Sequence, residues 1–181
     1  MKKNRQIDHE KYMDEALKEA KKAFDCGEVP IGAVITDKDG NIIGRGNNNV
    51  ERLGCQTGHA EINAIKDVCE KIVGWRLEDC TLYVTLEPCL MCFGLIGLSR
   101  IKMVYYGAKS PLFGSSEEVE SVGHIYCKGL VVKGGLKEAQ CTAILRLFFE
   151  QARKGRDGCE TKTRIPRKSK KKFTQKTRGN N

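Results

Sequence analysis

Two short segments of the sequence carry side chains that could bind a metal ion and move a proton. The first holds His59 and Glu61, and the second begins at Pro88, 27 residues after Glu61, and holds Cys89 and Cys92. One imidazole and two thiolates suit Zn²⁺, and three protein ligands leave a fourth position for water, as in a catalytic zinc site. We therefore expect a zinc ion on His59, Cys89 and Cys92, with Glu61 taking the proton of the water and delivering it to a substrate.

Two other interpretations of these residues stay open at this point. Cys89 and Cys92 could form a redox-active dithiol, although such pairs usually occur without a matched His-x-Glu segment. Cys55 could act as a fourth ligand, which would close the site and make the zinc structural. The catalytic interpretation is favoured because it uses all four residues.

Both segments are expected at the start of a helix. The apolar spacing after His59 predicts a helix over residues 59–73, and Pro88 can occupy the first turn of the next helix, where its missing N–H does no harm. In that helix the i, i+3 spacing places both thiols on one face. The helix N-terminus favours their thiolate forms.

The remaining pattern alternates helices with strands. Expected elements are a helix over 8–25, a hairpin of 31–35 and 42–43 around Asp39-Gly40, a loop over 47–58, strands over 81–86, 101–106 and 125–132, a long loop over 108–123 and a helix over 136–151. The strand over 81–86 is apolar enough to be central. Interleaved helices and strands predict an α/β fold with three α/β/α layers, in which both faces of a mixed sheet are covered.

The net charge of +9 is concentrated at one end of the chain. Residues 153–181 contain twelve basic and two acidic side chains, a balance of +10, so residues 1–152 carry −1. We expect one globular domain over 1–152 and a basic, disordered tail over 153–181 that either is merely solvated or binds RNA phosphates. No apolar run could span a bilayer, and the basic start lacks the apolar segment of a signal peptide. Nine cysteines, an odd number, favour a reducing cytoplasm.

The H-x-E…P-C-x-x-C pattern resembles the zinc-dependent nucleobase deaminases. A wider set of segments resembles the bacterial tRNA-specific adenosine deaminases over about residues 8–153. These segments are 27–34, 59–65, 75–77, 82–92, 99–101, 136–139 and 148–149.

The resemblance implies a cytidine-deaminase-like α/β/α sandwich that is usually a homodimer. It also implies hydrolytic deamination of adenosine to inosine at the wobble position (34) of tRNA anticodons, with one zinc ion per subunit and zinc-activated water. By motif, His59, Cys89 and Cys92 would be the ligands and Glu61 the proton shuttle.

The same resemblance places three further residues at the base. Asn48, eleven residues before His59, matches a base-contacting Asn whose amide can donate and accept hydrogen bonds at once. Val29 and Leu86 would line the base pocket. The sequence departs from the family at Ser110, where Asp is usual, and over residues 115–120, so contacts to tRNA are expected to differ there.

Two alternative functions share parts of this pattern. The zinc signature also suits a deaminase of a free base or nucleoside such as guanine or cytosine. An inactive RNA-binding subunit with the same fold is a third alternative, but the intact Glu61 argues against it. The segment contexts and the basic tail favour an RNA substrate and a cytoplasmic enzyme.

Overall fold

A single five-stranded sheet forms the centre of the protein. The computed structural model describes residues 7–71, 74–117 and 127–157. The strands lie in the order β2-β1-β3-β4-β5. Their bounds are β1 (Gly32–Thr36), β2 (Ile42–Asn47), β3 (Thr81–Leu86), β4 (Met103–Ala108) and β5 (Val131–Lys133). β1 is antiparallel to β2 and β3, whereas β3, β4 and β5 are parallel, so the predicted mixed sheet with a central β3 is confirmed.

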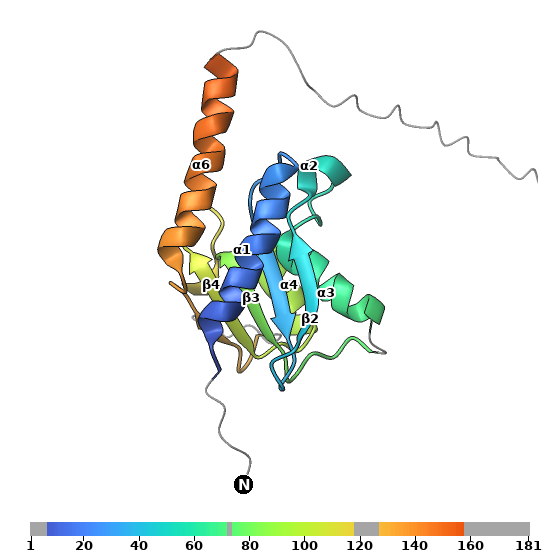
Figure 1. Cartoon of the computed structure of the whole chain (residues 1–181). Helices are drawn as coiled ribbons and strands as arrows, with labels where there is room; N and C mark the ends of the chain where they lie inside the picture. Colours follow the sequence, from blue (N-terminus) through green and yellow to red (C-terminus); the bar gives the residue numbers. More distant parts are fainter. Residues whose placement is uncertain (1–6, 72–73, 118–126, 158–181) are drawn as a thin grey trace, which may run out of the picture.

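Helices cover both faces of this sheet. They are α1 (His9–Asp25), α2 (Val50–Leu53), α3 (Ala60–Lys71), α4 (Leu90–Leu98) and α6 (Glu138–Asp157). One core cluster contains residues of α3 and α4, and a second contains residues of α1 and α6 (Figure 1). The predicted three-layer α/β/α sandwich is therefore confirmed. None of the described helices is long and apolar enough to cross a membrane.

The central strand shows why its sequence is apolar throughout. Leu82 and Val84 belong to the cluster under α3 and α4, while Tyr83 between them belongs to the cluster under α1 and α6. Successive strand residues point to opposite faces, and both faces are covered by helices. All three side chains are at most 1% exposed.

A glycine on β2 brings α3 close to the sheet. A Cβ at Gly46 would lie 2.2 Å from the carbonyl oxygen of Ala60 and 2.4 Å from the backbone nitrogen of Ala64. The first turn of α3 therefore lies directly on the strand, and only glycine leaves room for it. This contact sets the distance between β2 and the start of α3, where His59 and Glu61 lie.

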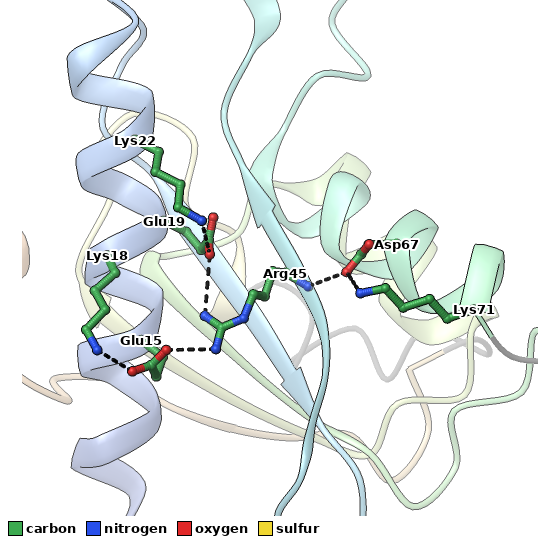
Figure 2. Close-up of polar contacts among 7 residues, drawn as sticks. All are labelled: Glu15, Lys18, Glu19, Lys22, Arg45, Asp67 and Lys71. Carbon is green, nitrogen blue, oxygen red and sulfur yellow. Dashed lines mark hydrogen bonds and ion pairs between the residues drawn. The ribbon is translucent and has the colours of Figure 1, made fainter.

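Arg45 of β2 connects helices on both faces of the sheet (Figure 2). Its guanidinium lies 2.8 Å from Glu15 Oε2 and 3.4 Å from Glu19 Oε1 on α1, and its backbone N–H donates to Asp67 Oδ2 on α3 at 2.9 Å. Three lysines pair with the same carboxylates, namely Lys18, Lys22 and Lys71. This network could not be predicted from the sequence, because its members are brought together only by the fold.

Several element boundaries differ from the sequence-based expectations. Pro88 precedes α4 instead of lying in its first turn, because Cys89 has the extended backbone of an N-cap. The predicted loop over 47–58 contains the short helix α2. The strand expected over 125–132 begins only at Val131. Residues 72–73, 118–126 and 158–181, which include parts of an expected helix, loop and strand and most of the tail, lie outside the described residues.

The last helix is longer than expected, and its buried side matches the predicted stripe only in part. The apolar spacing predicts a buried stripe through Ala139, Ala143, Ile144, Leu147 and Phe148. In the structure Cys141 is fully buried, Ile144 and Phe148 of the predicted stripe are half-buried, and Ala139, Ala143 and Leu147 are exposed. Cys141 packs into the space that Gly107 of β4 leaves free, because a Cβ there would lie 2.3 Å from Cys141 Sγ. The helix continues to Asp157 instead of ending at Gln151, and its end extends beyond the sheet (Figure 1).

Candidate metal centre and active site

The two predicted segments meet on one side of the sheet. His59 directly precedes α3 and its carbonyl accepts the N–H of Asn63 at 3.0 Å, while Cys89 caps α4 and Cys92 lies in the first turn of that helix. The donor atoms of His59, Cys89 and Cys92 all lie within 4.8 Å of one another. The expected grouping is therefore present, and it depends on the N-termini of α3 and α4, which lie on the same face of the sheet.

The spacing of these donors fits a tetrahedral zinc ion. His59 Nδ1 lies 3.4 Å from Cys92 Sγ and 3.7 Å from Cys89 Sγ. Tetrahedral Zn–N and Zn–S bonds of ordinary length would separate nitrogen and sulfur by about 3.6 Å. Cys92 is buried, but His59 and Cys89 are only partly so, which leaves one side of the site accessible.

Cys55 does not complete a four-ligand site. It is exposed, its sulfur lies 3.0 Å from Thr57 Oγ1, and it is not part of the donor group among the described residues. The structural-zinc alternative therefore loses its proposed fourth ligand. Three protein donors with an accessible side are typical of a catalytic zinc site.

Hydrogen bonds within the donor group already favour a thiolate. The hydrogen bond between Cys92 and Cys89 raises the pKa of Cys92 and lowers the pKa of Cys89 to about 4. A hydrogen bond with Cys89 raises the pKa of His59. The three groups thus share protons that a divalent cation would displace, because metal binding requires deprotonated thiols and a neutral imidazole.

Glu61 lies in the first turn of α3 beside these donors. Its side chain is 4% exposed. Burial raises the pKa of the Glu61 carboxyl group. A bound divalent cation would act in the opposite direction, since it favours the ionised carboxylate. A carboxyl group in this position can exchange a proton with a water or substrate held next to the metal.

Asn63 fastens the loop that carries Asn48 to the start of α3. Its side-chain amide donates to the carbonyl oxygen of Asn47 at 2.7 Å, to Asn49 Oδ1 at 3.0 Å and to the carbonyl oxygen of Gly58 at 3.2 Å. Asn48 is 5% exposed and lies between two of these anchored residues. The structure therefore holds Asn48 on the chain segment that runs into His59.

The two predicted pocket residues occupy less constrained positions. Val29 is half-buried and its carbonyl accepts the N–H of Ile31 at 2.8 Å. Leu86, at the end of β3, is half-buried and packs against the core cluster under α1 and α6. Their contact with a base remains a prediction.

Sequence reasoning gave no role to Glu87, the residue before Pro88. Its carboxylate accepts the backbone N–H of Ser110 at 3.0 Å, the backbone N–H of Ser116 at 3.2 Å and the hydroxyl of Ser116. Burial alone would raise the pKa of Glu87, but these hydrogen bonds lower it below its ordinary value. Its place directly before the cysteine motif was the only signal in the sequence.

The layered fold and the His-x-Glu and Cys-x-x-Cys pair define a zinc-dependent hydrolytic deaminase. The chain belongs to the cytidine and deoxycytidylate deaminase family, because the family model described as "Cytidine and deoxycytidylate deaminase zinc-binding region" matches residues 6–108. Family membership and the donor spacing together identify zinc as the cofactor, one ion for each site.

Similar proteins include tRNA-specific adenosine deaminases and a guanine deaminase. A protein of Bacillus subtilis (strain 168) named tRNA-specific adenosine deaminase is 45% identical over 151 residues, which cover 80% of this chain and 91% of the relative. A structure from a study of A-to-I editing by tRNA:A34 deaminases is 41% identical, covers 74% of this chain and 98% of that chain, and has a TM-score of 0.69. A guanine deaminase of Bacillus subtilis is 29% identical, covers 87% of this chain and 99% of that chain, and has a TM-score of 0.55. The resemblance to the bacterial tRNA-specific adenosine deaminases is confirmed.

Proposed function

We propose that this protein hydrolyses the adenosine at the wobble position (34) of tRNA anticodons to inosine and ammonia. The observation that carries the proposal is the buried Glu61 beside the donor group of His59, Cys89 and Cys92. The 45% identity to a protein named for this activity supports adenosine in tRNA over a free base. The guanine deaminase, at 29% identity, supports the alternative less well.

The chemistry follows from the position of Glu61. When bound at His59, Cys89 and Cys92, zinc supplies an activated water to the amino-bearing carbon of the purine. Glu61 accepts a proton from that water and delivers it to N1 of the ring, and it then assists the departure of ammonia. Its burial excludes bulk water, so the proton moves between Glu61 and the substrate.

Three residues are proposed to hold the base. Asn48 would hydrogen-bond the purine edge, because its amide can donate and accept at the same time. Val29 and Leu86 would contact the base through their apolar side chains. The hydrogen bonds of the Asn63 side chain support this role, since they hold Asn47 and Asn49, the residues on either side of Asn48.

A homodimer is proposed from the surface of α4. This nine-residue helix is apolar on all sides, and its outward face exposes Leu90 at 64%, Met91 at 40% and Leu98 at 51%. A helix that is apolar all round is normally buried, and a second copy of the chain could cover this face. The mass in solution, measured by light scattering, would test this arrangement, and a monomer would contradict it.

The remaining assignments concern the tail and the location of the protein. We propose that residues 1–152 form the zinc-dependent deaminase domain and that the basic segment 153–181, whose first residues continue α6, binds RNA phosphates. A cytoplasmic location agrees with a tRNA substrate. Deletion of 158–181 should weaken RNA binding and reduce its dependence on salt, and an unchanged salt dependence would contradict the tail's role.

The function is tested with a panel of substrates. The zinc-loaded full-length protein is incubated with an anticodon stem-loop that carries adenosine at the wobble position, and separately with free adenosine, cytidine, cytosine and guanine. We expect inosine to form at the wobble position of the stem-loop, and we expect no deamination of the free nucleosides and bases. Deamination of guanine or cytosine without any inosine in the RNA would support the alternative function instead.

A further inference from the structure

The loop after β4 is folded around the carboxylate of Glu87. The backbone N–H groups of Ser110 and Ser116 donate to its two different oxygens at 3.0 and 3.2 Å, and the Ser116 hydroxyl adds a third hydrogen bond. The backbone N–H of Ser115 donates to the carbonyl of Pro88 at 3.3 Å. The loop over 109–116 is thereby held at both ends against the two residues that precede the zinc ligand Cys89.

Gly114 shows how tightly this loop encloses the carboxylate. A Cβ at this position would lie 2.3 Å from Glu87 Oε2 and 2.7 Å from the carbonyl oxygen of Ser110. The Gly114 N–H donates to that same carbonyl at 2.9 Å, which closes the turn. The turn therefore leaves no room for a side chain at residue 114 while the Glu87 carboxylate lies against it.

This ordered loop carries two large apolar side chains at its tip. Leu112 is 85% exposed and Phe113 is 73% exposed, and neither belongs to a core cluster of the described residues. Exposed apolar groups on a fixed loop are typical of contact surfaces. An exposed aromatic ring next to a site for RNA can stack on an unpaired base, which most RNA-recognition sites use.

We propose that Glu87 is a positioning residue that fixes the 109–116 loop so that Phe113, with Leu112, stacks on a base of the RNA next to the reacting nucleotide. This inference rests on the proposed function. RNA is favoured over a second copy of the chain because the loop is hydrogen-bonded to Pro88, the immediate neighbour of a zinc ligand. The loop is therefore joined to the residue next to Cys89, a member of the donor group that would hold the metal. Glu87 touches no reacting atom, so it acts through Phe113.

The first test replaces the exposed ring. Phe113→Ser in the zinc-loaded full-length protein should raise the KM for the anticodon stem-loop about tenfold, the loss expected for one stacked base, with kcat and zinc content nearly unchanged. Phe113→Trp should restore the KM. Val131→Ser is the control, because Val131 is an exposed apolar side chain on β5, 42% exposed and outside the loop, and the KM of this variant should stay at the wild-type value.

The second test asks whether Glu87 acts through Phe113. Glu87→Gln should raise the KM in the same way, and the double variant should be no worse than Phe113→Ser alone, because both changes remove one contact. Additive effects, or a loss of kcat and zinc without a change in KM, would contradict the positioning role.

Binding to RNA separates this inference from the proposed function. The equilibrium Kd of the stem-loop is measured for each variant, so the result does not depend on turnover. A wild-type protein that makes no inosine would overturn the proposed function, whereas an unchanged Kd and KM in Phe113→Ser would overturn only this inference. A changed oligomeric mass in Phe113→Ser with an unchanged Kd would assign the loop to a chain–chain contact and would also overturn it.

Discussion

Two buried glutamates of this protein lie in opposite chemical settings. Glu19 on α1 is 3% exposed and Glu61 on α3 is 4% exposed. Glu19 Oε1 is paired with two cations, Lys22 at 2.8 Å and Arg45 at 3.4 Å (Figure 2). Glu61 instead lies beside a thiol and near an imidazole that are themselves metal ligands.

The comparison separates a structural carboxylate from a functional one. Burying a charge is costly unless a partner compensates for it. At Glu19 the partners are the partly exposed side chains of Lys22 and Arg45, so the carboxylate charge is compensated within the fold. At Glu61 the neighbouring groups lack a fixed positive charge, and a metal ion would provide it. Burial alone would have marked both residues as candidate catalytic groups, but the groups that lie next to them distinguish the two.

The largest effect is expected from removing a metal ligand. Cys89→Ala or Cys92→Ala should lose zinc and all measurable deamination, because two protein donors hold the ion poorly. Elemental analysis of the purified variants gives the zinc content. Full occupancy in either variant would show that the cysteine is not a ligand.

Glu61 and Glu19 should respond in opposite ways to the same conservative change. Glu61→Gln should keep zinc and lose activity by about 100- to 10,000-fold, the range for a lost acid–base group. Glu19→Gln, the matched control, should keep the activity of the folded enzyme within about twofold. Equal losses of kcat in the two variants would remove the distinction between them.

The free energy of unfolding should show the reverse order, with a larger loss for a change at Glu19 than for a change at Glu61. Glu19→Ala leaves Arg45 and Lys22 without their shared carboxylate and should lower the free energy of unfolding by about 1–2 kcal/mol, because both cations are partly exposed. This corresponds to a Tm decrease of about 2–8 °C. In the zinc-free protein, Glu61→Gln should be at least as stable as the wild type, since it removes a buried carboxyl group that burial disfavours in its charged form. A larger stability loss at Glu61 than at Glu19 would be inconsistent with this assignment.

The smallest effect is expected at a third polar cluster, which has neither ion pairs nor metal donors. His9 Nδ1 lies 2.8 Å from the Tyr83 hydroxyl and His9 Nε2 lies 3.1 Å from the Tyr105 hydroxyl. Burial, together with the charge of Lys133, lowers the pKa of His9. The unfolded chain therefore binds a proton more readily, and the contribution of His9 to stability is lost as pH falls below the ordinary histidine pKa of about 6.5.

Urea unfolding at pH 7.5 and pH 5.5 measures this contribution. The wild type should lose more stability between the two values than His9→Gln does. An identical pH dependence in the two proteins would show that His9 is not held in its neutral form.

The metal donors were predictable because their chemistry lies in short segments. His59, Glu61, Cys89 and Cys92 are specified by residue type and spacing, and the helix starts that carry them follow from local patterns. The layer order also followed from alternating helices and strands. Contacts between residues far apart in the chain were not predictable in the same way.

Three clusters illustrate what the sequence could not provide. Arg45 meets Glu15 and Glu19 only because β2 packs beside α1. His9 meets tyrosines 74 and 96 residues away, and no local pattern brings them together. Glu87 faces a loop that depends on where β4 ends. The buried side of α6 was predicted only in part for a similar reason, since Cys141 packs where Gly107 on another element leaves room for it.

The most direct test compares zinc-loaded wild type, Glu61→Gln and Glu19→Gln on one anticodon stem-loop with adenosine at the wobble position. Inosine is measured by mass spectrometry after digestion, with zinc content determined on the same samples. The wild type and Glu19→Gln should form inosine at that position, and Glu61→Gln should form almost none at equal zinc occupancy. Inosine formation by Glu61→Gln at the wild-type rate, or none by the zinc-loaded wild type, would contradict the account.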